Sequence, residues 1–203
     1  MNFFNFDRDK NLIKIASKIP QNKEVAQEIL YIVGNNTTKI EQDKDIKNSY
    51  YVYLKDTIYL ADNIKNNEGI SRVCLIAHEC RHSVQSKLLQ KLNFIFSNIE
   101  LLMFVFSFIF LIFSKNNYVL YSYITISIMS SLFRVILEVD ATIKSCEISK
   151  KYLDKKLEEN EANILVNIYK KYTSSLLPFF ILYLLIGKIV RILLIIFVIN
   201  FKL

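Results

Sequence analysis

Three long apolar stretches occupy much of the second half of this 203-residue chain, and they restrict the possible folds more than any other feature. The first lies within 94–113 and contains the uncharged run LLMFVFSFIFLIF, and the second covers 118–137. About 20 apolar residues are enough to cross a bilayer as a helix, in which the backbone polar groups satisfy one another. Only four residues, 114–117, separate the two stretches. The sequence therefore predicts a transmembrane helical hairpin over 94–137.

The third apolar stretch lies within 176–203 and differs from the others because it contains Lys188 and Arg191 close to its middle. A cation at that depth is costly unless it reaches the interface, pairs with an anion or faces a cavity. We expect one C-terminal membrane helix here; the alternative is a pair of shorter interfacial helices, broken near Gly187. Glu100, near the start of the first stretch, is also polar at a costly depth, which a wet cavity or an interfacial helix end would explain.

The net charge of +7 arises from 26 basic and 19 acidic residues that are interleaved along the chain. This arrangement is not the continuous basic stripe that follows nucleic-acid phosphates, so we expect no nucleic-acid partner. Lysines beside the apolar stretches would instead meet anionic lipid headgroups, and a solvated helix face with i,i+4 ion pairs is the alternative.

The positive-inside rule gives the expected orientation. The 114–117 turn has one lysine, whereas the flanks facing the other way carry several cations, which places the polar part of the chain in the cytoplasm. These flanking cations are Lys87, Lys91, Arg134, Lys144, Lys150 and Lys151.

Residues 1–98 are polar enough to be soluble, and the chain has only five Gly and Pro residues, which favours long helices. The run QNKEVAQEILYIVGN at 21–35 predicts an amphipathic helix that Gly34 ends. The run SYYVYLKDTIYLA at 49–61 contains two β-prone segments and predicts a hairpin in a small sheet. The expected fold class is therefore α+β and mainly helical.

The run His78-Glu79-Cys80-Arg81-His82 contains both histidines of the chain and matches the zinc-hydrolase pattern H-E-x-x-H. On a helix, positions i and i+4 lie on one face, so His78 and His82 can offer nitrogens to one cation. Glu79 lies between them, where it can accept a proton from a metal-bound water. The alternative is two solvated histidines on an ordinary helix, but an apolar stripe beside them favours the metal site.

A catalytic zinc ion normally has three protein ligands and one open position, so a third ligand is needed. With no further histidine in the chain, a carboxylate or a cysteine must supply it. The predicted hairpin returns the chain after 137 to the side on which the histidines lie. Glu138 leaves the membrane edge first, and Asp140, Cys146 and Glu147 reach the same side.

Thr142 and Asp140, which both follow Glu138 in the sequence, are candidates for hydrogen bonds that orient the metal ligands. Thr142 shares the helix face of Glu138, whereas Asp140, two positions on, is expected to point largely elsewhere. The alternative role for Glu138 is a solvated carboxylate at the interface, paired with Arg134 four residues earlier.

The segments YYVYLKDTIYLADNIKNNEGISRVCLIAHECRHSVQ and LFRVILEVDATIKSCEISKKYL, with the apolar C-terminal stretch, resemble the small bacterial membrane-embedded neutral zinc metallopeptidases. The resemblance runs from about 20 to 153, and both motif blocks occur in the family's order. It implies a zincin-like cytoplasmic domain in the bacterial cell membrane, with Zn²⁺ as cofactor.

Residue by residue, the resemblance implies that His78 and His82 are metal ligands, that Glu79 is catalytic and that Glu138 is the third ligand. The chain departs from the family at Arg81, where a glycine usually stands, and lacks the family's usual additional N-terminal span. A bulky cation at this position could crowd the motif or repel the metal, or it could pair with a carboxylate.

We therefore expect a zinc metallopeptidase in which Glu79 is the general base, with the lipid bilayer and a peptide or membrane-protein substrate as partners. Two other interpretations are a zinc-binding membrane regulator or scaffold without hydrolase activity, and a helical membrane assembly or transport component in which the motif is accidental. Nothing in the sequence indicates an oligomeric state. The expected parts are 1–93 with the motif helix, the 94–137 hairpin, 138–175 with the third ligand and a charged connector, and 176–203.

Overall fold

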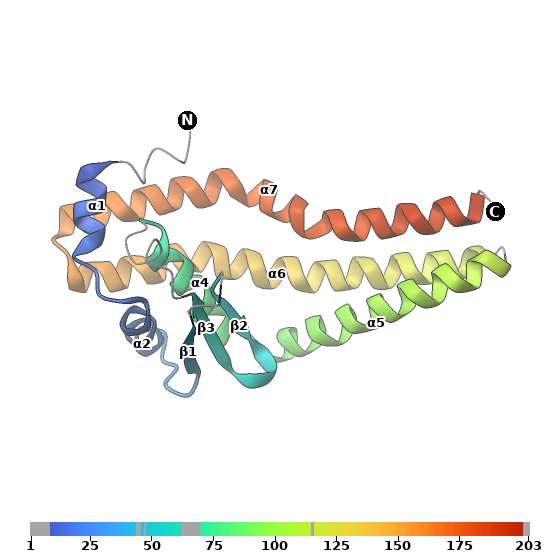
Figure 1. Ribbon diagram of the computed structural model, residues 1–203, viewed down its shortest axis with the longest axis horizontal. Coiled ribbons are helices and arrows are strands. Elements are labelled where there is room, and N and C mark those ends of the chain that lie inside the picture. Colours follow the sequence, from blue (N-terminus) through green and yellow to red (C-terminus); the bar gives the residue numbers. More distant parts are fainter. Residues whose placement is uncertain (1–8, 44–45, 47, 62–69, 115, 201–203) are drawn as a thin grey trace. The chain divides into compact units, whose positions relative to one another are not determined.

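The computed structural model describes residues 9–43, 46, 48–61, 70–114 and 116–200 (Figure 1). It is mainly helical with one small sheet, as the sequence predicts. The helices are α1 (Lys10–Ser17), α2 (Asn22–Ile32), α4 (Arg72–Ser83), α5 (Lys87–Phe113), α6 (Asn117–Lys156) and α7 (Glu159–Asn200). The strands are β1 (Lys39–Asp43), β2 (Tyr50–Val52) and β3 (Thr57–Ala61), with the short 3-10 helix η2 (Tyr53–Lys55) between the last two.

The chain divides into two compact units. The first comprises Met1–Gln85 and Val139–Leu176, and the second comprises Ser86–Glu138 and Leu177–Leu203. The divisions in α6 and α7 fall inside continuous helices.

The predicted amphipathic helix in 21–35 is confirmed as α2. Val25 and Ile29, which share one face, are completely buried in the core of the first unit. Gly34 follows the helix with φ +76°, a left-handed conformation that glycine adopts without a steric penalty. The amide of Asn35 donates to the carbonyl of Leu30, which closes the helix end.

The predicted hairpin is also confirmed: β2 and β3 pair antiparallel, with Tyr51 opposite Ile58. The strand that the sequence does not predict is β1, which pairs parallel with β3 and makes β3 the central strand. Ile58 and Leu60 of β3 are completely buried, and α4 packs against both β2 and β3 (Figure 1). The sheet therefore supports the helix that carries the two histidines.

The start of α4 is held by side chains from elsewhere in the first unit, because Ser71 at the N-cap position makes no side-chain capping bond. Arg72, which is buried, donates through Nη1 to the Pro20 carbonyl at 2.7 Å and through Nη2 to the Ile19 carbonyl at 2.6 Å. Tyr169 of α7 donates its hydroxyl to the Ile70 carbonyl at 2.5 Å. Burial lowers the pKa of the Arg72 guanidinium below its usual value, but arginine still stays charged near neutral pH.

We expect the Arg72→Met variant to lose about 2–4 kcal/mol of unfolding free energy, since it leaves buried carbonyls without their charged donor. Thermal unfolding in detergent micelles, followed by circular dichroism, measures the change. The matched control is Lys144→Met, which removes a cation from an exposed ion pair with Glu147 and should change stability by less than about 1 kcal/mol. Equal stability of the Arg72 variant and the control would contradict this role for Arg72.

The second unit contains the apolar parts of α5, α6 and α7, and each of these helices is long and apolar enough to span a membrane. α5 begins at Lys87, several residues before the predicted start at 94. α7 continues without a break through Gly187, and it also contains Pro178. The alternative of two helices broken near Gly187 is therefore wrong. A helix interrupted within an apolar environment would leave its backbone groups without partners, which continuity avoids.

Three charged side chains in the apolar parts of these helices, Glu100, Lys188 and Arg191, have polar partners. Arg191 Nη1 lies 2.7 Å from Glu100 Oε2, and the Tyr123 hydroxyl donates to Glu100 Oε1 at 2.7 Å. Lys188 Nζ donates to Ser130 Oγ at 2.5 Å. A cation in an apolar segment can reach the interface, pair with an anion or face a cavity, and the structure shows that Arg191 pairs with an anion.

Candidate metal centre

The side chains of His78, His82 and Glu138 come together in the structure. His78 and His82 lie one turn apart on α4, and Glu138 lies on α6. One ligand atom from each residue lies within 4.8 Å of the other two, and all three residues are half-buried. Among the described residues, this is the group of histidine, cysteine and acidic side chains with a geometry able to hold a metal ion.

The two imidazoles are spaced as ligands of one small cation would be. The Nε2 atoms of His78 and His82 lie 3.1 Å apart. Two nitrogens that each bind a tetrahedral zinc ion at about 2.0–2.1 Å would be separated by roughly 3.3 Å. Two imidazoles and one carboxylate also leave a fourth position for water or substrate, the arrangement of a catalytic rather than a structural site. The donor set and its spacing thus fit a divalent metal such as zinc.

The other candidates for the third ligand have different surroundings. Asp140 pairs with Arg81, and Glu147 is exposed and pairs with Lys144. Cys146 is buried, with its sulfur 3.5 Å from Thr173 Oγ1. Burial raises the pKa of the Cys80 thiol within the motif, which keeps this cysteine in the unreactive protonated form.

Glu79 follows His78 on α4 and is half-buried. On an α-helix Glu79 projects about 100° from His78 and about 60° from His82, so it lies beside the face that the two histidines share and not on it. A carboxylate there can receive a proton from a water beside the histidines without itself being one of the three clustered ligand groups.

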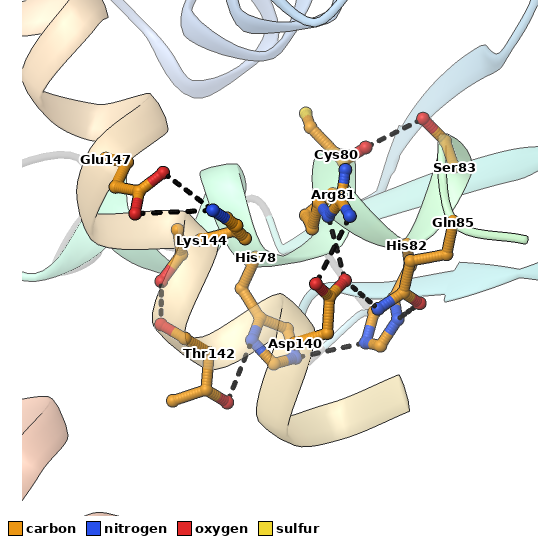
Figure 2. Close-up of polar contacts among 11 residues, drawn as sticks. His78, Cys80, Arg81, His82, Ser83, Gln85, Asp140, Thr142, Lys144 and Glu147 are labelled. Carbon is orange, nitrogen blue, oxygen red and sulfur yellow. Dashed lines mark hydrogen bonds and ion pairs between the residues drawn. The ribbon is translucent and has the colours of Figure 1, made fainter. Parts of the chain in front are cut away.

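Arg81 forms a bidentate ion pair with Asp140. Its Nε lies 2.9 Å from Asp140 Oδ2, and its Nη2 lies 3.2 Å from Asp140 Oδ1, so both carboxylate oxygens are engaged (Figure 2). Although partial burial raises the pKa of Asp140, the hydrogen bonds from Arg81 and Gln85 outweigh that effect and lower the pKa below its usual value. Of the alternatives for Arg81 that the sequence left open, the structure shows pairing with a carboxylate, whose charge offsets that of the guanidinium.

The expectation that Asp140 points largely elsewhere is wrong. Asp140 faces α4, where its Oδ2 also accepts from Gln85 Nε2 at 2.8 Å. Asp140 lies roughly 200° around α6 from Glu138 at about 100° per residue. The long side chains of Arg81, on α4, and of Gln85, just after α4, reach it, a reach that a helical wheel of α6 alone does not include.

Gln85 is the residue that the sequence analysis missed. It is buried, and its Oε1 lies 2.8 Å from His82 Nδ1 (Figure 2). The available signal was its place three residues after the second histidine, just beyond the end of α4. Thr142 lies near the other histidine, with Oγ1 3.4 Å from His78 Nδ1. In both cases the contact is to Nδ1, which leaves the Nε2 atoms facing each other.

Comparison of the chain with family models, with curated proteins and with solved structures finds no match. The resemblance to membrane-embedded zinc metallopeptidases therefore remains a prediction that depends on the motif blocks.

Proposed function

We propose that this chain is a membrane-bound zinc metallopeptidase in which His78, His82 and Glu138 hold the metal and Glu79 acts as general base. The observation that supports it best is the convergence of the three ligand atoms within 4.8 Å, although Glu138 is 56 positions after His82. The H-E-x-x-H pattern alone requires only the two histidines and Glu79 to share a helix, whereas a distant carboxylate completing the set is an independent requirement of the same chemistry.

When bound, zinc lowers the pKa of its water toward about 7 and polarises the scissile carbonyl. Glu79 accepts a proton from the attacking water and returns it to the leaving amine, so that one carboxylate serves both halves of the hydrolysis. Metal binding alone needs no carboxylate at this position. Its presence favours hydrolysis over the role of a zinc-binding regulator.

The proposed substrates are membrane proteins or their juxtamembrane segments, cut on the cytoplasmic side. α5, long and apolar enough to cross a bilayer, begins at Lys87 soon after the motif helix ends, so the motif lies close in sequence to a membrane boundary. β2 is an edge strand of the sheet and packs against α4. An extended peptide added alongside β2 would run past the motif helix, a common mode of peptide recognition.

The experiment that tests the proposed function measures metal content and peptide cleavage on the same purified full-length protein. We expect about one zinc per chain by elemental analysis, and cleavage of a mixed peptide library that stops on chelation and returns with added zinc. The Glu138→Ala variant should lose most of its zinc, whereas Glu147→Ala, which removes an exposed glutamate of the same helix, should retain it.

Two results would contradict the proposal in different ways. Zinc bound by the wild type without cleavage of any peptide or membrane-protein substrate would favour the regulator. Zinc absent from the wild type would favour an accidental motif in a helical membrane assembly.

A further inference from the structure

We infer that Gln85, held by Asp140 and Arg81, is a positioning residue that fixes the proton of His82 on Nδ1 and so leaves Nε2 as the atom that binds the metal. The inference rests on the proposed function only for the identity of the ligand. The hydrogen-bonded chain itself is a feature of the first unit, and all four of its residues belong to that unit. It gives a role to Arg81, the residue at which the sequence departs from the family pattern.

The chain of hydrogen bonds begins at Arg81, which can only donate. It engages both oxygens of Asp140, at 2.9 and 3.2 Å, in a bidentate pair that favours the ionised carboxylate. An ionised carboxylate can only accept, so the group of Gln85 that lies 2.8 Å from Asp140 Oδ2 must be its amino group. The orientation of the Gln85 amide is therefore fixed by chemistry and does not depend on distinguishing oxygen from nitrogen by position.

With its amino group turned to Asp140, Gln85 presents only its oxygen to His82, 2.8 Å from Nδ1. An amide oxygen can only accept, so Nδ1 must carry a hydrogen. A neutral imidazole has one ring proton, and Nε2 then keeps its lone pair. This is the atom that faces His78 Nε2 at 3.1 Å, within the candidate metal centre. Each bond in the chain determines the polarity of the next.

The burial of Gln85 strengthens this argument. Gln85 is 5% exposed, so water competes little for its amide, and a reversed amide would place its amino group against Nδ1 and its oxygen against a carboxylate. That reversal would oppose two acceptors at short range and would force His82 to carry its proton on Nε2. Metal-ligating histidines generally donate their other ring hydrogen to an acceptor of this kind, and removing that acceptor weakens metal binding roughly 10- to 100-fold.

Because the chain contains only two histidines, ¹⁵N-histidine labelling of the full-length protein in micelles gives signals from just two rings. The ¹⁵N shifts of a neutral imidazole distinguish its two tautomers without any metal. We expect the wild-type His82 ring to carry its proton on Nδ1, and the Gln85→Leu variant to give a mixture of tautomers. Affinity for Zn²⁺ and Co²⁺, measured by competition with a chelator, should fall roughly 10- to 100-fold in that variant.

The rescue variant exchanges the two side-chain types by combining Gln85→Glu with Asp140→Asn. The new carboxylate at position 85 still accepts from His82 Nδ1, and the new amide at position 140 donates to it while its oxygen accepts from Arg81 Nη2. The polarity of the bonds to position 85 is therefore preserved, whereas the bond from Arg81 Nε, which shares Asp140 Oδ2 with Gln85 in the wild type, is given up. We expect the Nδ1 tautomer and recovery of most of the roughly 10- to 100-fold loss of metal affinity. The control Asp154→Asn removes another ion-paired aspartate of α6, partnered by Lys150, and should change neither measurement.

A wild-type His82 protonated on Nε2 would overturn the inference, as would a folded Gln85→Leu variant with unchanged tautomer and affinity. Thermal unfolding shows whether each variant is folded. If Gln85→Leu does not fold, the tautomer and the metal affinity of the rescue variant are compared with those of the wild type instead. Failure of the proposed function is distinguishable, because a wild type without metal or cleavage still reports its tautomer. The positioning role of Gln85 would also be contradicted if Gln85→Leu lost metal affinity and the rescue variant did not restore it. Side-chain volume, and not hydrogen-bond polarity, would then determine the affinity.

Discussion

The Glu79→Gln variant is expected to lose peptide cleavage by a factor of about 10²–10⁴ while keeping its zinc content, the range that a positioned general base typically contributes. The amide has nearly the same shape as the carboxylate but cannot accept a proton at neutral pH. Glu79 is also outside the cluster of three ligand atoms, so its replacement leaves the donor set intact. Cleavage is measured under single-turnover conditions on a peptide that the wild type cuts, and zinc by elemental analysis of the same preparation.

Two further variants identify the cause of that loss. Glu79→Asp keeps a carboxylate with a shorter reach and should retain part of the activity. Glu147→Gln changes an exposed glutamate paired with Lys144 and should cleave like wild type. Cleavage that persists undiminished in Glu79→Gln would exclude the proposed mechanism, while loss of both zinc and cleavage would make Glu79 a ligand and not a base.

The sequence predicted those elements whose pattern is local. α2 follows from its apolar face and from Gly34, and the β2–β3 hairpin follows from two β-prone runs close together. β1 has the sequence KIEQD, in which Ile40 is the one apolar residue, so neither alternation nor apolar content marks it as a strand. It forms because it pairs with β3, a neighbour 18 positions away in register (Lys39 with Thr57), and such pairing depends on tertiary context.

The alternative of a break near Gly187 is wrong for a physical reason that the local sequence pattern does not include. An isolated glycine costs a helix only about 1 kcal/mol relative to alanine. Interrupting an apolar helix exposes several unsatisfied backbone groups, which costs more where no water is available. In an apolar segment the same residue is therefore a weaker helix breaker than in a soluble one.

The candidate site could be predicted only in part. The histidines and Glu79 share one helix, so periodicity indicates their arrangement, and the hairpin argument indicated Glu138 as the returning carboxylate. The hydrogen bonds around them could not be found in this way, because Gln85, which follows α4, contacts Asp140 on α6. Helix periodicity describes the face of one helix, whereas the contact of Asp140 depends on how far the side chains of α4 extend toward it.

In the second unit, two charged residues that are each costly in an apolar helix, Glu100 and Arg191, pair with each other. Glu100 on α5 is 2% exposed, and Arg191 on α7 lies near the middle of an apolar segment. Their side chains form an ion pair of 2.7 Å, to which Tyr123 donates a hydrogen bond and Phe104 adds a ring 5.8 Å from the guanidinium carbon. Neither a wet cavity nor an interfacial helix end is needed to explain Glu100. Residues 91 positions apart in sequence satisfy each other.

We expect Glu100→Ala to destabilise the protein by about 3–5 kcal/mol, because it leaves the Arg191 guanidinium in an apolar environment without its anion. The double variant Glu100→Met with Arg191→Met should recover most of that loss, since replacing both charges with apolar side chains of similar volume is often neutral or stabilising. A double-mutant cycle of unfolding in micelles, with Arg191→Met as the other single variant, isolates the coupling between the two residues. If the single and double variants unfolded alike, the pair would contribute nothing to the stability of the second unit. The zinc content of the double variant should stay at the wild-type level, because neither residue belongs to the cluster of metal-ligand atoms.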